Sequence, residues 1–316
     1  MTQLRFPLFV ALTLAGLCLA FSSCNTESRS QNAPTTRKTG VLLVNHGSHS
    51  PTWRQALLDL ETAVKDSLLA TGIIQGTRTA YMEYTEPSIA TQLKAFDAEG
   101  YTDIILVPVF LTVSSHSFDD IPTIIGQKED PQSLETLKIE KIERYTPKAK
   151  VHITPLLDFT DVLKQNILRR ARALSKNPSE EGLVLIAYGD ETYMKEWTSL
   201  MHDVGRYVKE HAGIEAYSYG WCGHVAHYNP DSTTVAINRV LKVKKQALVV
   251  PVLVAHDEMF QVKIIGDGIS KTGNDKARIT YIPDSILPDP VVEKWVIGIA
   301  TEYARKIHNN EVAYLQ

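Results

Sequence analysis

The strand pattern of this chain occurs twice, at an offset of about 142 residues. The aliphatic run at residues 40–46 ends in a histidine, and the similar run at residues 182–188 ends in a tyrosine. A second pair of runs, residues 103–111 and 246–254, carries a proline at the same place in each copy. The repetition predicts a duplicated structural unit, with function concentrated in the copy that keeps histidines at its strand ends.

Short aliphatic strands alternate with helical patterns in both copies, which is typical of parallel sheets covered by helices on both faces. The sequence therefore predicts an α/β fold of two duplicated lobes, each a parallel sheet flanked by helices, with a ligand cleft between the lobes. Short second strands are expected at residues 79–83 and 215–219. Helices are expected at residues 53–69, 88–99, 162–175, 196–211, 233–242 and 291–307.

The polar segment 177–182, which contains Pro and Gly, is the best boundary between the copies. The predicted organisation is a signal peptide, a flexible tether, an N-terminal lobe with the functional site and a C-terminal lobe with a degenerate site. These parts span residues 1–23, 24–38, 39–178 and 179–316, respectively.

The first residues have the pattern of an export signal. Arg5 precedes a nearly continuous apolar run over residues 6–20, which is short for a membrane span. The segment from Phe21 to Cys24 resembles a lipobox, although Phe21 stands where an aliphatic residue is usual. We expect an exported, periplasmic or cell-envelope lipoprotein anchored at Cys24, with secretion without lipidation as the alternative.

Charge and cysteine content argue against a nucleic-acid partner and against an internal disulfide. A formal net charge of −3 without a long basic run argues against nucleic acid as a partner, and leaves the lipid anchor as the expected contact with a membrane. Of the three cysteines, only Cys222 lies beyond the signal and lipobox, so no internal disulfide is expected. A small hydrophobic residue in a core or turn is the favoured interpretation of Cys222, with a reactive or ligating role as the alternative.

Three chemistry-bearing side chains follow three successive strands of the first copy: His46, Glu83 and His116. Because ligand sites of open α/β sheets lie beyond the carboxyl ends of the strands, these side chains are expected to meet at one edge. Two imidazoles and a carboxylate suit borderline divalent ions such as Co²⁺, Ni²⁺, Fe²⁺ and Zn²⁺. Taken singly, each residue is equally well explained as a solvated strand end. Glu86 is a second carboxylate nearby with a weaker claim.

These motifs resemble a known family. The His-Gly-Ser element at His46, the Glu83-x-x-x-Pro87 element and the His116-x-x-x-Asp120-Ile-Pro122 element are similar to those of class II tetrapyrrole chelatases of the sirohydrochlorin cobaltochelatase type. The resemblance extends over residues 39–310.

The resemblance implies a metal chelatase, a lyase that inserts a divalent metal into a sirohydrochlorin-like tetrapyrrole without ATP. Co²⁺ is the favoured substrate ion, with Fe²⁺ or Ni²⁺ as alternatives. It also implies that His46 and His116 handle the metal and protons, that Glu83 is the acidic residue of the site, and that a homo-oligomer is allowed. No nucleotide is expected, since the stretch 266–272 lacks the Gly before Lys that a phosphate-binding P-loop needs and is predicted to be a loop.

The second copy departs from this pattern. Tyr188 is expected to replace His46, Tyr219 to replace Glu83, and Met259 to replace His116. A degenerate lobe that forms the other wall of a macrocycle cleft is the favoured explanation. Aromatic side chains that could flank a flat ring there are Tyr188, Tyr217, Tyr219 and Trp221, and histidines that could face the cleft instead are His224, His227 and His256.

Two other functions remain open from the sequence. One is an exported, non-catalytic carrier of a tetrapyrrole or metal on the same fold, which the export signal favours because macrocycle biosynthesis is normally cytoplasmic. The other is a structural or interaction lipoprotein with a vestigial site.

Overall fold

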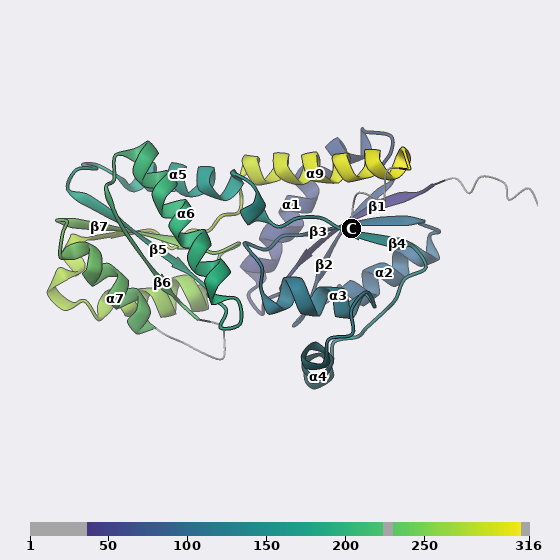
Figure 1. Cartoon of the computed structure of the whole chain (residues 1–316), viewed down its shortest axis with the longest axis horizontal. Helices are drawn as coiled ribbons and strands as arrows, with labels where there is room; N and C mark the ends of the chain where they lie inside the picture. Colours follow the sequence, from purple (N-terminus) through teal and green to yellow (C-terminus); the bar gives the residue numbers. More distant parts are fainter. Residues whose placement is uncertain (1–36, 224–229, 311–316) are drawn as a thin grey trace, which may run out of the picture. The chain divides into compact units, whose positions relative to one another are not determined.

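The computed structural model describes residues 37–223 and 230–310, and these form two four-stranded parallel sheets (Figure 1). The first sheet has the order β2-β1-β3-β4, and the second has the equivalent order β6-β5-β7-β8. The predicted duplication and its α/β architecture are therefore confirmed. The strands are β1 (Thr39–Asn45), β2 (Gly76–Tyr81), β3 (Asp103–Pro108), β4 (Lys150–Ile153), β5 (Glu181–Ala187), β6 (Ala216–Trp221), β7 (Gln246–Val252) and β8 (Ile279–Tyr281).

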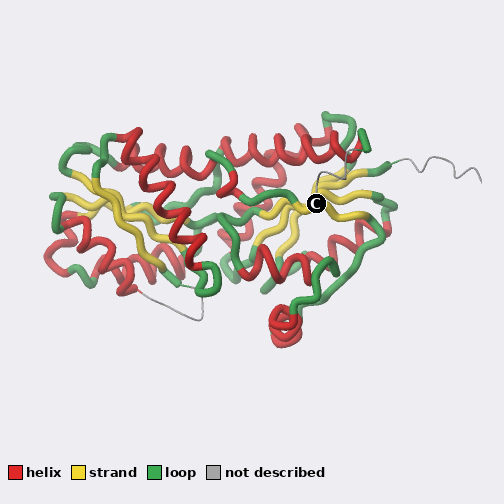
Figure 2. The backbone as a smooth tube through the Cα atoms, in the orientation of Figure 1, coloured by secondary structure: helices red, strands yellow, loops and turns green. Residues whose placement is uncertain are grey.

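Helices cover both faces of each sheet (Figure 2). The first helix shows why they form: the Ser50 hydroxyl accepts a hydrogen bond from the Trp53 N–H, Pro51 occupies the first turn, and apolar residues at helical spacing are buried. The α-helices are α1 (Pro51–Leu69), α2 (Ile89–Ala98), α3 (Ile121–Ile124), α4 (Pro131–Ile139), α5 (Val162–Leu174), α6 (Met194–Ala212), α7 (Pro230–Leu241), α8 (Gly266–Ser270) and α9 (Pro290–His308).

Other helical turns join these elements. Short 3₁₀ turns are η2 (Leu157–Phe159) and η4 (Gly273–Arg278). Two π-helices, η1 (Ser115–Asp120) and η3 (Glu258–Ile265), follow the equivalent strands β3 and β7. The duplication therefore includes these π-helices, a form that is rare and is frequent at functional sites.

The hydrophobic core is continuous between the lobes on one side of the sheets. One cluster of buried side chains includes Leu43 of β1 and Leu57 of α1 together with Leu185 of β5 and Val204 of α6. The opposite face of each sheet has its own cluster, which contains α2 and α3 in the first lobe and α7 and α8 in the second. The lobes therefore share buried apolar surface, the dominant favourable contribution to folding.

The two lobes exchange their last helices. Helix α5, which ends the first copy in the chain, contacts α6 and β7 of the second lobe, whereas α9 contacts α1 and β3 of the first lobe. Figure 1 shows α9, in yellow, beside α1. The buried carboxylate of Asp289, at the start of α9, accepts hydrogen bonds from Asn166 and Arg169 of α5. The predicted boundary near residue 178 separates the two sequence copies. It does not separate the two packed lobes, because α5 and α9 each pack on the other copy's lobe.

Two local predictions were wrong. From the sequence, the proline at the end of the stretch from Asp119 to Pro122 predicts a turn. The stretch instead ends the π-helix η1 and begins α3, where the proline occupies the first turn. Residues 266–272 are not a loop, because Gly266–Ser270 form helix α8 directly after η3. In both places one helical segment continues into another, which a search for isolated apolar periodicity does not detect.

Several expectations concern residues outside the described ranges. These are the signal peptide, most of the tether, the lipidation site Cys24, and the histidines His224 and His227. Within residues 37–223 and 230–310, no helix has the length and apolar character needed to cross a membrane.

Candidate metal centre

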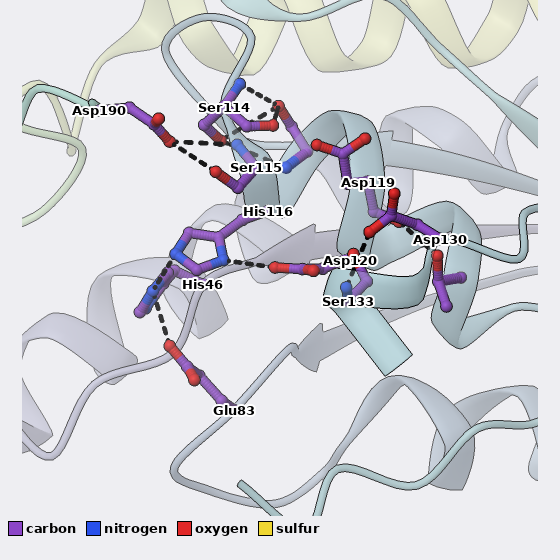
Figure 3. A network of polar contacts seen from close by, with 12 residues as sticks. His46, Glu83, Ser114, Ser115, His116, Asp119, Asp120, Asp130, Ser133 and Asp190 are labelled. Atoms are coloured by element: carbon purple, nitrogen blue, oxygen red, sulfur yellow. Dashed lines mark hydrogen bonds and ion pairs between the residues drawn. The ribbon is translucent and has the colours of Figure 1, made fainter. Parts of the chain in front are cut away.

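His46, Glu83 and His116 come together at the carboxyl edge of the first sheet (Figure 3). One ligand atom of each lies within 4.8 Å of the others. The Nε2 atoms of the two imidazoles are 3.2 Å apart, and Oε1 of Glu83 is 2.7 Å from Nε2 of His46. The Glu83 side chain is nearly buried, while each histidine keeps 23% of its side chain exposed. The cluster is therefore reachable from solvent through the imidazoles.

A tight turn after β1 places His46 beside Glu83. Gly47 has a φ of 102°, and a Cβ there would lie 2.1 Å from the Glu83 carbonyl oxygen, so only glycine fits. The Glu83 N–H donates to the His46 carbonyl at 3.0 Å, which extends the β1–β2 pairing beyond the strands. This backbone contact brings the carboxylate to the imidazole.

The π-helix η1 carries His116. Its start is capped reciprocally: the Ser114 hydroxyl accepts from the Ser117 N–H, and the Ser117 hydroxyl accepts from the Ser114 N–H. Nδ1 of His116 lies 2.8 Å from Oδ2 of Asp120, a carboxylate that is itself nearly buried. The carboxylate holds the ring orientation and leaves Nε2 directed at His46.

The hydrogen bonds determine which nitrogens are available for a metal. Nδ1 of His46 is 3.0 Å from the Gly47 carbonyl, which can only accept, so Nδ1 carries a proton. Nδ1 of His116 likewise donates to the Asp120 carboxylate. Each Nε2 lone pair of the neutral imidazoles therefore faces the cluster. A tetrahedral ion with metal–nitrogen bonds of about 2.0–2.1 Å holds two nitrogen ligands about 3.3 Å apart, which matches the observed separation.

The charges around His46 favour its protonated form when no metal is bound. Burial lowers the pKa of His46, but the hydrogen bond and charge of Glu83, the Gly47 carbonyl and the charge of Asp120 together raise it above 6.5. A cation is therefore stabilised at this position. The negative charge of Glu83, which favours the proton on His46, also attracts a divalent ion to the site.

One exposed aromatic side chain contacts the cluster, and a second lies on the π-helix that carries His116. Tyr84 is 38% exposed and its ring centroid is 5.7 Å from that of His46; Phe118, on η1, is 56% exposed. Tyr84 has a φ of 68°, a conformation that costs energy for a residue with a side chain and is most frequent at functional sites. Burial and the charge of Glu83 raise the pKa of the Tyr84 hydroxyl, so it stays protonated.

Comparisons with known proteins show the family of the chain. The CbiX family profile matches residues 40–174. A sirohydrochlorin cobaltochelatase of Methanococcoides burtonii is 33% identical over 102 residues, which cover 31% of this chain and 70% of that protein. A protein of the same name from Methanosarcina barkeri is 32% identical over 95 residues, covering 30% of this chain and 70% of that protein. The chain belongs to the CbiX family of class II chelatases.

Solved structures show the same fold for this CbiX-family chain. The sirohydrochlorin chelatase SirB of Bacillus subtilis subspecies spizizenii, in complex with cobalt, superposes with a TM-score of 0.60 at 16% identity, covering 86% of this chain and 97% of that one. SirB of Bacillus subtilis with Fe³⁺ superposes with a TM-score of 0.62 at 17% identity, covering 86% and 98%. The two-lobe architecture is thus common to all three.

The structure leaves other predicted residues outside the cluster of His46, Glu83 and His116. Glu86 is exposed, and its carboxylate accepts a hydrogen bond from the Ser88 N–H near the start of α2. Nδ1 of His256 donates a hydrogen bond to the Pro283 carbonyl, 2.8 Å away, because a carbonyl oxygen can only accept. Cys222 is fully buried in the core of the second lobe, and burial raises the pKa of its thiol, so the prediction of a core residue is confirmed.

Strand register gives the true equivalences between the lobes, and one predicted equivalence was wrong. His46 corresponds to Tyr188, as expected. The Glu83 N–H donates to the His46 carbonyl and the Gly223 N–H donates to the Tyr188 carbonyl, so Gly223, rather than Tyr219, replaces Glu83. Tyr219 lies on β6, where it pairs with Leu185. The strands predicted at residues 79–83 and 215–219 were matched at their last residues, whereas β2 ends at Tyr81 and β6 continues to Trp221.

The remaining positions of the second lobe also lack the site's donors. Met259 is the second residue of η3, as His116 is of η1. Tyr217, Tyr219 and Trp221 pack against the shared core, and Tyr217 also contacts His202. Among its described residues, the second lobe therefore has neither the imidazole pair nor the carboxylate at the equivalent positions.

Sequence reasoning missed the supporting residues of the site. Asn45 is fully buried directly before His46, and among the described residues neither atom of its amide has a hydrogen-bond partner. Its equivalent in the second lobe is Ala187, which follows from the strand register. The duplication offered a signal for this residue: at this position of the first strand, an amide side chain is present only in the lobe that has the histidines.

Proposed function

We propose that this protein is a metal chelatase that inserts a divalent ion, with Co²⁺ favoured, into a sirohydrochlorin-like tetrapyrrole without ATP. Membership of the CbiX family supports the reaction class. The observation that carries the proposal is the convergence of the His46 and His116 Nε2 atoms and the Glu83 carboxylate beside the exposed ring of Tyr84. The donor set suits a borderline divalent ion better than Mg²⁺ or Ca²⁺, which take oxygen ligands.

The proposed reaction has two requirements that these residues meet. The ion must exchange hydration water for protein ligands, which the two imidazoles and the carboxylate provide. The macrocycle must lose two pyrrole N–H protons as its nitrogens bind the ion, so that one divalent cation enters and two protons leave. Glu83 and His46 are paired at 2.7 Å and form a proton acceptor at the same place as the ligands.

We propose that His116 is the more strictly oriented ligand of the pair. Its Nδ1–H donates to the Asp120 carboxylate, an arrangement that fixes the tautomer and the ring orientation. His46 uses a backbone carbonyl for the same purpose, and its Nε2 is paired with Glu83. His116 is thus suited to hold the ion, and the His46–Glu83 pair to accept protons as well.

The surroundings of the cluster suit a flat, acidic macrocycle. The exposed rings of Tyr84 and Phe118 offer apolar contact to a ring face. The Lys128 ammonium lies 4.5 Å from the centroid of the Phe118 ring, where it also pairs with Asp119. A cation next to an exposed aromatic surface is a suitable partner for a peripheral carboxylate of the substrate.

The test is an absorbance assay of purified protein with sirohydrochlorin and, in separate reactions, Co²⁺, Fe²⁺ or Ni²⁺. Metallation changes the macrocycle spectrum, and we expect multiple turnovers with Co²⁺ above the rate without protein. Stoichiometric binding of macrocycle or metal without turnover would instead show a carrier. Absence of both binding and turnover would contradict any role of the cluster in metal handling.

We also propose that the chain is exported and lipidated at Cys24. The support is the sequence pattern alone: a positive residue, an apolar run and the Ser-Ser-Cys segment. In that setting the protein would act on a tetrapyrrole in the cell envelope.

A further inference from the structure

A carboxylate from the second lobe holds the helix that carries His116. Asp190 follows β5, and its Oδ2 accepts from both the backbone N–H and the hydroxyl of Ser115, each at 3.1 Å (Figure 3). Ser115 is the first residue of η1 and directly precedes His116. The other oxygen, Oδ1, accepts from the N–H groups of Thr192 and Tyr193 at 2.9 and 3.1 Å. Asp190 is thus held within its own turn while it caps the π-helix of the other lobe.

A second contact joins the same two segments. The Tyr193 hydroxyl donates to Oδ2 of Asp119 at 2.8 Å, and its ring lies edge-on to Phe118 at a centroid distance of 6.1 Å. The turn that contains Asp190 and Tyr193 therefore contacts η1 on both sides of His116 in the sequence.

The duplication contains the reciprocal contact. Ser48 stands two residues after His46, as Asp190 stands two residues after Tyr188. The Ser48 hydroxyl donates to Oδ2 of Asp257 at 2.6 Å, and Asp257 is the N-cap of η3 in the second lobe. Each lobe thus uses the turn after its first strand to bind the start of the other lobe's π-helix. The described part of the second lobe lacks the metal donors at the equivalent positions, yet it retains this contact to the lobe that has them.

We propose that Asp190 is a positioning residue for His116, so that the lobe without metal ligands completes the metal centre of the other. The inference rests on the proposed function. Nε2 of His116 must stay 3.2 Å from that of His46 to share an ion, and η1 begins only one residue before His116. Hydrogen bonds to a carboxylate are about twice as strong as those between neutral groups, which makes Asp190 an effective anchor. Residues that orient metal ligands typically contribute about 10- to 100-fold to metal affinity or activity.

The chain offers a matched control. Asp190→Ala removes the anchor of η1, whereas Asp257→Ala removes the equivalent bond between the lobes at η3, whose second residue is Met259. Both variants lose contact between lobes, so a general loosening of the fold affects both. Asp190→Asn tests rescue, because the amide oxygen can still accept from Ser115 although one of the two oxygens is replaced by a donor.

Two measurements on the full chain distinguish a role of Asp190 in positioning His116 from a role in lobe packing alone. Hydrogen exchange by mass spectrometry, on metal-free protein, reports whether residues 115–120 are held. Calorimetric titration with Co²⁺ and the chelatase assay report the metal centre. For Asp190→Ala we expect faster exchange in residues 115–120, Co²⁺ affinity lowered by about 10-fold or more, and kcat lowered more than the macrocycle KM is raised. Asp257→Ala is expected to speed exchange in residues 258–265 and to keep wild-type Co²⁺ affinity, and Asp190→Asn to restore part of the loss.

Three results would overturn the proposal: wild-type exchange of residues 115–120 in Asp190→Ala, wild-type Co²⁺ affinity despite faster exchange, or an equal loss of affinity in Asp257→Ala. Failure of the proposed function looks different, because wild-type protein itself would then bind no Co²⁺ and show no turnover. In that case Asp190 would have no metal ligand to position, and the exchange data would assign it to lobe packing alone.

Discussion

The Nε2 atoms of His46 and His116 lie 3.2 Å apart although the residues are 70 positions apart in the chain. Each imidazole is oriented by a different acceptor, the Gly47 carbonyl for His46 and the Asp120 carboxylate for His116. Two neutral rings would face each other with unshared electron pairs, so a cation between them is favoured. This relationship is the basis of the predictions on metal handling.

His116→Ala removes a proposed metal ligand and is expected to lower chelatase turnover by about 10²- to 10⁴-fold, the range for the loss of a group that accepts or donates a proton. The side chain is 23% exposed, so the folded state should persist. Steady-state turnover with Co²⁺ and sirohydrochlorin measures the effect, with circular dichroism as the check on folding. Met259→Ala, at the equivalent position, is the control and should keep wild-type turnover. Near wild-type turnover in folded His116→Ala would remove His116 from the site.

Co²⁺ binding should weaken as pH falls. The pKa of His46 is raised above 6.5, so below the raised value a proton occupies the imidazole that the ion needs. The affinity is expected to be highest above that pKa and to fall about tenfold per pH unit below it for each proton released. Calorimetric titrations between pH 6 and 8, in buffers of different ionisation enthalpy, count the protons. Affinity independent of pH would mean that His46 does not bind the ion.

Asn45→Ala should stabilise the fold. An unpaired buried amide costs about 1–3 kcal/mol, and part of this gain is lost because the smaller side chain leaves a cavity, so a net gain of roughly 1 kcal/mol is expected. Denaturant unfolding measures it. Ala187→Asn, at the equivalent position of the second lobe, is the reverse change and should destabilise. A loss of stability in Asn45→Ala would show that the amide has a partner that stabilises the folded protein. Loss of turnover with the gain in stability would indicate that the amide serves the reaction.

The mature protein is expected to begin at a lipidated Cys24 and to partition into the membrane fraction. A single acyl chain gives only reversible membrane binding, so stable partition requires that the lipid on Cys24 carry more than one chain. Intact-mass analysis after detergent extraction reads the modification directly. Cys24→Ala should move the protein to the soluble fraction. An unmodified N-terminus downstream of Cys24 would leave secretion without an anchor.

The chain by itself determined the duplication, the parallel sheets and the three site residues. Aliphatic strands and strand-end polar residues are local patterns, and parallel strands bring their carboxyl ends to one edge, so His46, Glu83 and His116 could be predicted to meet. The equivalence of Tyr219 and Glu83 failed because register depends on hydrogen bonds between strands, here those of His46 with Glu83 and of Tyr188 with Gly223, rather than on counting.

Only the tertiary structure decided how the lobes depend on each other. The exchange of α5 and α9 joins residues more than a hundred positions apart, as in the pair Asn166 and Asp289. The periodicity of the sequence does not predict such a contact. The bond from Ser115 to Asp190 is of the same kind: both are ordinary polar residues at turns, and either could be solvated in isolation. The two residues form a hydrogen bond only when the lobes are packed against each other. A bond between distant segments depends on the packing of the whole chain and not on either segment alone.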